Sequence, residues 1–444
     1  MTAALDGARR VVFLDDDPTG TQTVRDLPVL TRWSVEDIQW ALRQDTAGFF
    51  VLTNTRSLAP RDAAARDREV VEACLAAAGR EGARLAFASR SDSTLRGHFP
   101  LETDVITEVL AEHGKRVDAI VLNPAYTDAG RVTIGGTHWV RTGEDLVPVA
   151  DTEFAKDATF GFTSSRLADW VEEKSGGRIP ASEVAELTVD DLRAGDLAKL
   201  SGARDGQVVA VDTAEDGDLR VAVQGILEAE AAGVSFVYRV GPSFVRARVG
   251  QDVQPPIDDG ALTSLVHGGA HGLVVVGSHV GLTSRQLAKL AERREFVNVE
   301  LDVPSLLDSP EGQIERAVAE AADALEHSLV VLSTSRTLVR GADEAASLDI
   351  ARRVSSALTT TAGRIVAARR PAYVVAKGGI TSSDVATESL GIGRAWVRGS
   401  LLPGIVSLWE PVSGLAQGLP YVVFAGNVGT EDSLADVVDR LEKA

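Results

Sequence analysis

The chain has 444 residues, 44% of them hydrophobic and 25% charged, which is the composition of a soluble globular protein with two or three domains. Its formal net charge of -19 argues against a nucleic-acid surface, so any anionic ligand must be held by local donors. The single cysteine, Cys74, excludes an internal disulfide and a cysteine-based zinc site, and the absence of a signal-peptide pattern or a bilayer-spanning apolar run predicts a cytoplasmic protein.

The first half of the chain alternates short apolar runs with helical periodicity. Strands are predicted at 11–14, 48–52, 84–88, 118–122, 207–211 and 234–240, and helices at 35–43, 60–80, 100–114, 166–174, 189–200 and 219–232. Strand, polar loop and helix repeat in the manner of a parallel α/β sheet. Residues 132–150 are less regular and predict a β excursion, and Ser164 or Ser165 is expected to cap the helix that follows.

The second half is also predicted to be α/β. Strands are predicted at 273–276, 296–301, 329–332 and 372–376, β hairpins at 391–429 and a closing helix at 431–442. Between the halves, residues 250–260 contain Pro255-Pro256 and have the composition of a linker. We therefore expect an α/β protein of two domains, each a largely parallel sheet flanked by helices. The predicted bounds are an N-terminal domain at 1–250, a linker at 251–266 and a C-terminal domain at 267–444.

The stretch VVFLDDDPTG at 11–20 places three carboxylates where the first strand ends. Adjacent carboxylates repel one another and are costly to desolvate, so the run must face water, donors or a cation. The carboxyl ends of parallel strands form the ligand crevice of an α/β sheet, where Asp15, Asp16 and Asp17 could bind a hydroxylated substrate, accept a proton or ligate Mg²⁺. The alternative is a solvated acidic turn.

A second polar cluster follows the strand predicted at 84–88. The segment SDSTLRG at 91–97, together with Arg90, supplies a carboxylate, three hydroxyls and two guanidiniums, and Arg56 follows the neighbouring strand. Guanidiniums bind carboxylates in a bidentate manner, while hydroxyls and Asp92 suit a polyol. The segment therefore predicts a pocket for a small hydroxy acid, or else the usual caps of a helix N-terminus.

Glycine-bearing turns mark the second half. The segment KGGITSSD at 377–384 follows an apolar run and opens a helix, and its glycines let backbone N–H groups approach an anion. It predicts a phosphate cradle with Thr381 and Ser382 as extra donors, although the lysine precedes the glycines and the loop is not a Walker A motif. Two more glycine-bearing strand ends, at 276–278 and 424–429, favour a nucleotide site over a plain strand-to-helix turn.

Two histidines lie in polar loops, His138 and His279, where either could assist catalysis. The seven histidines of the chain show no metal-ligand spacing. Structural hydrogen bonding is therefore the role expected for both.

Six motifs occur in the order seen in a known family. They are DDDPTGTQTV at 15–24, TNTRSL at 53–58, SDSTLRGHFP at 91–100, NPAYTDAGRVTIGG at 123–136, KGGITSSDVA at 377–386 and FAGNVG at 424–429. In these motifs the chain resembles the four-carbon acid sugar kinases over almost its whole length. The resemblance implies an N-terminal domain that binds a threonate-like or tetronate-like acid and a C-terminal domain that binds ATP. It also implies transfer of the γ-phosphoryl group to a substrate hydroxyl in an active-site cleft between the domains.

The resemblance assigns roles residue by residue. The nucleotide contacts fall on Ser278, Gly378, Gly379, Ile380, Thr381 and Gly426. The substrate side falls on Asp16, Asp17, Arg56, Arg90, Asp92, Ser93, Thr94 and Arg96. Asp92 or Asp16 is the candidate catalytic base. Arg90 stands where many members of the family have lysine.

The expected cofactors are ATP and Mg²⁺, and the expected partner is a small acid sugar of the threonate, erythronate or 3-oxo-tetronate type. Neither a nucleic acid nor a membrane is expected, and a homodimer is a candidate assembly. Two other functions stay open. The pattern Asp15-x-Asp17-x-Thr19 after an apolar strand resembles the nucleophile motif of haloacid-dehalogenase-type phosphatases, which form an aspartyl-phosphate on the first aspartate. The other is a protein of the same fold that binds ligands without catalysis.

Overall fold

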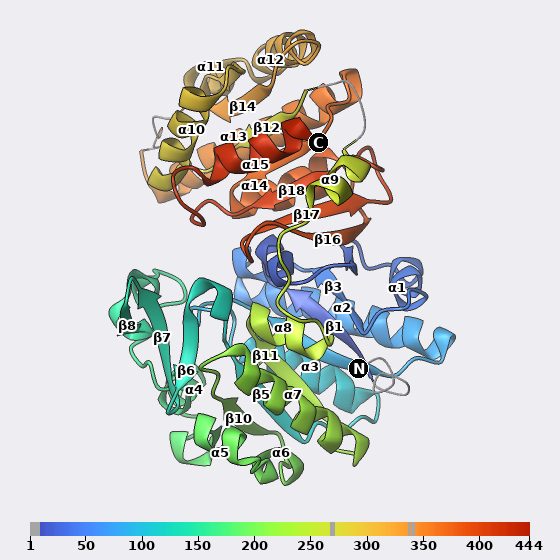
Figure 1. The fold of residues 1–444 in the computed structure, drawn as a ribbon, viewed down its shortest axis with the longest axis vertical. Coiled ribbons are helices and arrows are strands. Elements are labelled where there is room, and N and C mark those ends of the chain that lie inside the picture. Colours follow the sequence, from blue (N-terminus) through green and yellow to red (C-terminus); the bar gives the residue numbers. More distant parts are fainter. Residues whose placement is uncertain (1–8, 267–270, 336–338, 340–341) are drawn as a thin grey trace. The chain divides into compact units, whose positions relative to one another are not determined.

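The computed structural model describes residues 9–266, 271–335, 339 and 342–444, and the chain divides into two units, Met1–Gln254 and Pro255–Ala444 (Figure 1). Part of the stretch predicted to be a linker forms the short helix α9 (Asp259–Leu265), whose Leu262 is buried in the core of the second unit. No helix of the described residues has the length and apolar character needed to cross a membrane.

The first unit is built on a parallel sheet. Its strands follow the order β2 (Leu27–Leu30), β3 (Gly48–Leu52), β1 (Arg10–Asp15), β4 (Leu85–Arg90), β11 (Phe236–Val240), β5 (Ala119–Asn123), β10 (Gln207–Val211) and β9 (Ala185–Leu187). The described pairings in this order are all parallel, as the short β-branched and aromatic runs predict. The sheet is therefore the buried centre of an α/β unit.

The winding of this sheet reverses at β1, which has β3 on one side and β4 on the other. The register pairs Asp15 with Leu52 of β3 and with Arg90 of β4. Ligands of open α/β sheets bind outside the carboxyl ends of the strands at such a switch point. The aspartate run therefore lies where the sequence predicts an active-site edge.

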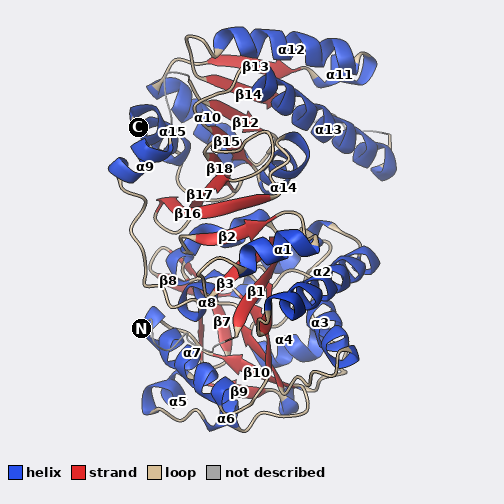
Figure 2. Cartoon of the chain, turned by 90° about the vertical axis from the view of Figure 1, so that its right-hand side faces the viewer, coloured by secondary structure: helices blue, strands red, loops and turns tan. Residues whose placement is uncertain are grey.

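Helices cover both faces of the strands in each unit (Figure 2). In the first unit these helices are α1 (Val35–Leu42), α2 (Pro60–Glu81), α3 (Leu101–Glu112), α4 (Leu167–Lys174), α5 (Val189–Ala194), α6 (Ala198–Ser201), α7 (Asp216–Ala231) and α8 (Pro242–Arg248). Residues of α1, α2 and α3 form one core with Val12, Phe49 and Phe87 of the strands. Cys74 lies in that core, where burial raises the pKa of its thiol. It packs as a small apolar residue.

One local prediction for the first unit is confirmed, and others need correction. The β excursion is confirmed as an antiparallel sheet of β6 (Arg131–Ile134), β7 (Thr137–Thr142) and β8 (Asp145–Pro148). The single helix expected at 189–200 is two helices, α5 and α6, because Gly195 adopts a left-handed φ of 73° between them. The N-cap of α4 is Arg166 instead of a serine. Strand β2 was not predicted, because Pro28 argues against a strand interior.

The second unit mixes parallel and antiparallel pairs. Its strands follow the order β13 (Val297–Leu301), β14 (Val330–Thr334), β12 (Leu273–Val276), β15 (Val374–Lys377), β18 (Tyr421–Phe424), β17 (Val406–Pro411) and β16 (Arg394–Leu402). The hairpin predicted near the end is confirmed for β16 and β17, whereas β18 also joins β15 in parallel. Its longer helices are α10 (Gly281–Arg293), α12 (Pro310–Ala324), α13 (Glu344–Ala368) and α15 (Ser433–Lys443), with shorter α11 (Val303–Asp308) and α14 (Gly379–Asp384).

The second sheet also has a switch point. Strand β12 pairs with β14 on one side and with β15 on the other, in parallel in both cases. Val276 at the end of β12 is the register partner of Lys377 at the end of β15. The glycine-bearing turns that follow these two strands therefore start side by side.

Candidate active site

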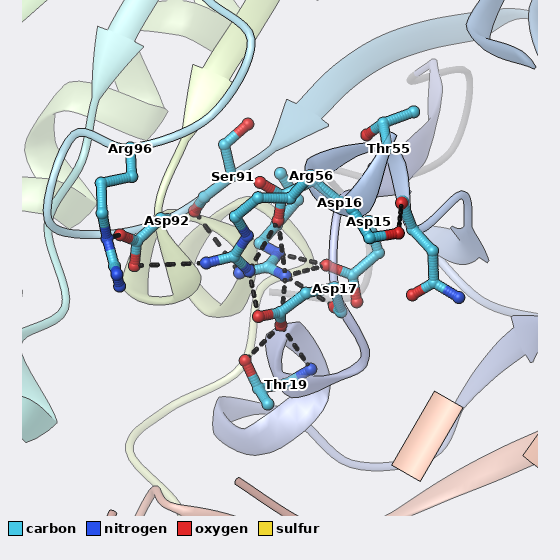
Figure 3. A network of polar contacts seen from close by, with 12 residues as sticks. Asp15, Asp16, Asp17, Thr19, Thr55, Arg56, Ser91, Asp92 and Arg96 are labelled. Carbon is cyan, nitrogen blue, oxygen red and sulfur yellow. Dashed lines mark hydrogen bonds and ion pairs between the residues drawn. The ribbon is translucent and has the colours of Figure 1, made fainter. Parts of the chain in front are cut away.

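The three aspartates at the end of β1 contact two arginines, one at the end of a neighbouring strand and one in the turn that follows the other neighbouring strand (Figure 3). Arg90, the last residue of β4, contacts Asp15, donates from Nη2 to the backbone oxygen of Asp17 over 2.9 Å and lies 3.4 Å from Asp16 Oδ1. Arg56, in the short turn after β3 (Thr55–Ser57), contacts Asp17 and lies 3.2 Å from Asp16 Oδ1. Asp15 is 0% exposed and Asp16 is 2% exposed, so the solvated acidic turn is excluded.

These neighbouring carboxyls do not titrate alike. Burial raises the pKa of Asp16 to about 7 in spite of Arg56 and Arg90, and its Oδ2 has no hydrogen-bond partner among the described residues. Burial also raises the pKa of Asp15. For Asp17 burial acts in the same direction, but Arg56, Arg90 and hydrogen bonds from Thr19 outweigh it and lower the pKa. Asp16 is thus a carboxyl poised to exchange a proton near neutral pH.

Asp92 lies in the loop after β4, between two guanidiniums. Arg96 Nε donates to Asp92 Oδ2 over 2.7 Å, Arg56 Nη1 lies 3.8 Å from Oδ1, and the Thr94 hydroxyl also contacts the carboxylate. Burial opposes ionisation of Asp92, yet these cations and hydrogen bonds hold its pKa well below the ordinary range. Asp92 is therefore a fixed negative charge, and its affinity for a proton is low.

A histidine fixes the backbone of this loop. His138 Nε2 lies 2.8 Å from the Ser93 backbone oxygen, and its Nδ1 lies 2.9 Å from Thr133 Oγ1. Burial lowers the pKa of His138 to about 4, so the ring is neutral and Nε2 carries the proton donated to Ser93. The structural role expected for His138 is confirmed.

Other polar groups of the cluster face the interior. Glu102 of α3 accepts hydrogen bonds from Thr55 over 2.7 Å, Ser89 over 2.6 Å and Ser91 over 3.1 Å. Ser91 was predicted to offer its hydroxyl to a polyol, but Glu102 holds that hydroxyl. Sequence reasoning missed Glu102, because a glutamate in a helix is commonly solvent-facing.

Two arginines that sequence reasoning missed also border the site. Arg239, in the buried strand β11, donates from Nη2 to the Arg96 backbone oxygen over 2.9 Å and so helps to fix the loop. Arg131 begins β6, and the Asp92 carboxylate acts on its pKa. Two signals in the sequence could have identified them. Arg239 is an arginine inside an apolar strand, and Arg131 is the last residue of the motif NPAYTDAGR.

The residues assigned to the nucleotide come together at the second switch point. A Cβ on Gly426 would lie 2.6 Å from Ser278 Oγ, and one on Gly378 would lie 2.9 Å from Thr381 Oγ1. Gly378 has a φ of 128°, which side chains rarely allow. A Cβ on Gly379 would meet no described heavy atom within 4 Å, so this backbone borders open space. A phosphate could approach the N–H groups here closely.

Apolar side chains flank these glycines. Ile380 is 67% exposed and Val280 is 47% exposed, and they lie at the N-termini of α14 and α10, which follow the glycine-bearing turns. Thr283 Oγ1 lies 3.1 Å from the Gly426 backbone oxygen and 3.3 Å from Ser278 Oγ, and so holds two of the turns together. The edge therefore offers both anion-binding backbone and an apolar surface for a base.

The conspicuous polar side chains of KGGITSSD are turned inward. Lys377 is 0% exposed; its Nζ donates to the Ala425 backbone oxygen over 2.6 Å and lies 3.7 Å from the Phe424 ring centroid. Burial lowers the pKa of Lys377 to about 7. Ser382 donates to the Ala376 backbone oxygen over 2.7 Å and is also fully buried, so its predicted role as an extra phosphate donor is wrong.

Comparisons with known proteins agree with this division. A model described as a sugar-binding N-terminal domain matches residues 11–248, and one described as a nucleotide-binding C-terminal domain matches residues 273–434. A D-threonate kinase from Bordetella bronchiseptica is 30% identical, with 86% of this chain and 84% of the relative covered. The chain belongs to the four-carbon acid sugar kinase family.

Further members of the acid sugar kinase family and its fold are similar over most of the chain. A D-erythronate kinase from Heliobacterium modesticaldum is 27% identical over 407 residues, with 88% of this chain and 86% of the relative covered. A crystal structure of a putative tRNA synthase from Salmonella typhimurium has a TM-score of 0.69 at 17% identity and covers 98% of this chain and 99% of its own. That likeness concerns the fold alone.

The phosphatase alternative does not fit the geometry of this acid sugar kinase family member. A nucleophilic aspartate must be ionised and reachable, whereas Asp15 is buried against Arg90 with a raised pKa. Within the described part of the chain, no group of three or more His, Cys, Asp and Glu residues could hold a metal ion. The guanidiniums of Arg56 and Arg90 occupy the position beside the aspartates where Mg²⁺ was considered.

Proposed function

We propose that the protein is an ATP-dependent kinase that phosphorylates a hydroxyl of a four-carbon acid sugar of the threonate, erythronate or 3-oxo-tetronate type. Relatives named D-erythronate kinase and D-threonate kinase support the reaction class. The observation that carries the proposal is the pair of switch points. One bears a buried cluster of carboxylates and guanidiniums, and the other bears a glycine-lined edge.

The proposed base is Asp16. Phosphoryl transfer forms a bond from the substrate oxygen to the γ-phosphorus, breaks the bond to the ADP oxygen and releases the hydroxyl proton, which Asp16 takes. A base works best when its pKa lies near the operating pH, and burial raises the pKa of Asp16 to about 7. Asp92 was the other candidate base from sequence, but its lowered pKa suits it to accept a hydrogen bond from a substrate hydroxyl instead.

The nucleotide would occupy the edge lined by Ser278, the 378–381 turn and Gly426. Backbone N–H groups of the turn would face the phosphates, and the exposed Val280 and Ile380 would cover the adenine. ATP enters as its Mg²⁺ complex, in which phosphate oxygens and water supply most of the metal ligands. Mg²⁺ bound to ATP would supply charge neutralisation on the phosphates, and the cytoplasm is the compartment that would supply both ATP and Mg²⁺.

The direct test is ADP release with Mg-ATP against D- and L-threonate, D- and L-erythronate and the 3-oxo-tetronates. We expect ADP formation that depends on one acid and rises with its concentration to saturation. Mass spectrometry of the product would show addition of one phosphoryl group. Binding of ATP without acid-dependent ADP release from any member of the panel would contradict the proposal and would favour a binder that has lost its chemistry.

A further inference from the structure

The arginines assigned to the substrate by sequence are already engaged. Arg56 and Arg90 pair with the aspartates after β1, as described above. Arg96 pairs with Asp92, and its Nη1 lies 3.6 Å from Asp157 Oδ2. A substrate carboxylate that bound one of these guanidiniums would compete with the protein carboxylate that is already paired with it. Such competition lowers the gain from binding.

Arg131 is a fourth guanidinium at the site, and it is held by aromatic rings. It lies 5.7 Å from the centroid of the Tyr126 ring and 5.9 Å from that of Phe154, while Arg96 lies 5.1 Å from the same Phe154 ring. Phe154 thus brings two guanidiniums together, and one of them is bonded to Asp92. Cation–π contacts fix the direction of the Arg131 side chain without using its N–H donors.

No carboxylate of the described residues pairs with Arg131, and its Nε is buried without a hydrogen-bond partner. Burial lowers the pKa of this guanidinium, and the Asp92 carboxylate partly offsets the effect. Arg96, which is bonded to Asp92, contacts the same Phe154 ring as Arg131, so this shared ring places Arg131 on the Asp92 side of the site. A buried donor without a partner is costly unless a ligand completes it. An anion that entered beside Asp92 would supply that partner.

We infer that Arg131 binds the carboxylate of the acid substrate and selects acids over uncharged polyols. The inference rests on the proposed kinase function, and it names the group that reads the acid. A guanidinium offers two parallel N–H donors that match the two oxygens of a carboxylate. With the carboxylate held by Arg131, the hydroxyls of a short chain extend toward Asp92 and Asp16. The rest of the substrate is uncharged and therefore needs no further cation.

The test compares each acid with the uncharged alditol of the same stereochemistry in wild type and in Arg131→Met. We expect the KM for the acid to rise roughly 10- to 100-fold, which is the range for loss of a charge-assisted hydrogen bond. The KM for ATP and the activity toward the alditol should stay unchanged. Arg131→Lys keeps the charge but not the bidentate geometry, so its KM for the acid should fall between the two.

Arg141 of β7 provides the matched control, because it is an exposed arginine of the same small antiparallel sheet. Arg141→Met should keep the wild-type preference for the acid. Equal loss of activity toward acid and alditol in Arg131→Met would assign Arg131 a structural role and overturn the inference, as would an unchanged preference. A wild type that neither binds nor turns over any four-carbon acid would instead overturn the proposed function itself.

Discussion

Asp16 shows how one residue acquires a property that its neighbours lack. It shares Arg56 and Arg90 with Asp17, yet only Asp17 also accepts hydrogen bonds from Thr19, and the pKa values of the two carboxyls move in opposite directions. A carboxylate that lacks donors on one oxygen gains little from ionisation in a buried position. The incomplete hydrogen bonding of Asp16 is therefore what suits it to accept a proton.

This difference predicts the pH profile. Because Asp16 must be ionised to act as a base and its pKa is about 7, kcat/KM should fall as pH decreases through about 7. Asp16→Asn should lower kcat by about 100-fold or more and remove this limb from the residual activity. The ionisation of ATP itself would still affect the pH profile of that variant, and so it serves as the internal control. A wild-type profile that stays flat to about pH 5 would assign the base to Asp92, whose pKa is far lower.

Asp67 of α2 is a second buried carboxyl, and both of its oxygens lack hydrogen-bond partners among the described residues. Burial, Glu102 and Asp16 raise its pKa well above the ordinary value. At pH values between the pKa of Asp67 in the unfolded chain and its higher pKa in the folded chain, the Asp67 carboxyl is protonated in the folded state and ionised in the unfolded state. This contribution to stability is therefore complete below about pH 4 and is lost as pH rises. Asp67 thus opposes folding most at alkaline pH.

We expect Asp67→Asn to raise the free energy of unfolding relative to wild type by about 1–3 kcal/mol near pH 8, and by much less near pH 5. Urea unfolding of both proteins at the two pH values measures the difference. Asp62→Asn, at an exposed position in the first turn of the same helix, is the control and should show no such change. A difference for Asp67→Asn that does not depend on pH would refute this account of its titration.

At the scale of elements, Lys377 links two strands of the second unit. It ends β15, and its Nζ bonds to the Ala425 backbone oxygen just beyond β18. Gly378 follows Lys377 directly and Gly426 follows Ala425, and both glycines belong to turns assigned to the nucleotide. Lys377 therefore acts on the nucleotide site by positioning backbone, and a direct ion pair with phosphate is not what its geometry favours.

Replacing Lys377 by methionine keeps the aliphatic packing and removes this bond. We expect the Kd for a non-hydrolysable ATP analogue to rise by roughly 5- to 30-fold, as loss of one buried hydrogen bond implies, with the binding of the acid unchanged. Calorimetric titration measures both. Lys289→Met, on the exposed face of α10, should leave ATP binding as in wild type. A Kd for the analogue that is the same in Lys377→Met and wild type would show that the turns do not depend on this bond.

The elements themselves were largely predictable, because apolar runs of four to six residues between polar loops have few other readings. The predicted strand at 48–52 and that at 207–211 match β3 and β10. What could not be predicted is the direction of individual side chains. Ser382 and Lys377 belong to a motif that suggests phosphate donors, yet both face the core, because strand pleat and tertiary packing set the orientation of a side chain and composition does not.

The site in the first unit shows the same limit. Asp92 and Arg96 were predicted because they are adjacent in sequence to other polar residues. Arg131 and Glu102 were missed, because only the folded chain brings them next to that loop. Long-range partners of this kind lie beyond what local spacing can specify.

At the scale of the whole molecule, the two sets of candidate residues belong to different units. The groups that hold Asp92 are Arg56, Thr94 and Arg96 of the first unit, and the turns that hold Gly426 belong to the second. Residues that share no contacts usually act additively on binding. Damage to one set should therefore spare the ligand of the other set while still abolishing turnover, which needs both.

Two variants test this division. Asp92→Ala should lower kcat by about 100-fold or more, because a substrate hydroxyl loses its acceptor, while the Kd for ATP stays within about twofold of wild type. Gly426→Val should weaken ATP binding, since a Cβ there would lie 2.6 Å from Ser278 Oγ, while acid binding is retained. Calorimetry with each ligand measures both variants. If either substitution weakened the binding of both ligands equally, the two sites would not be separate, and Asp92 would lose its assignment to the acid.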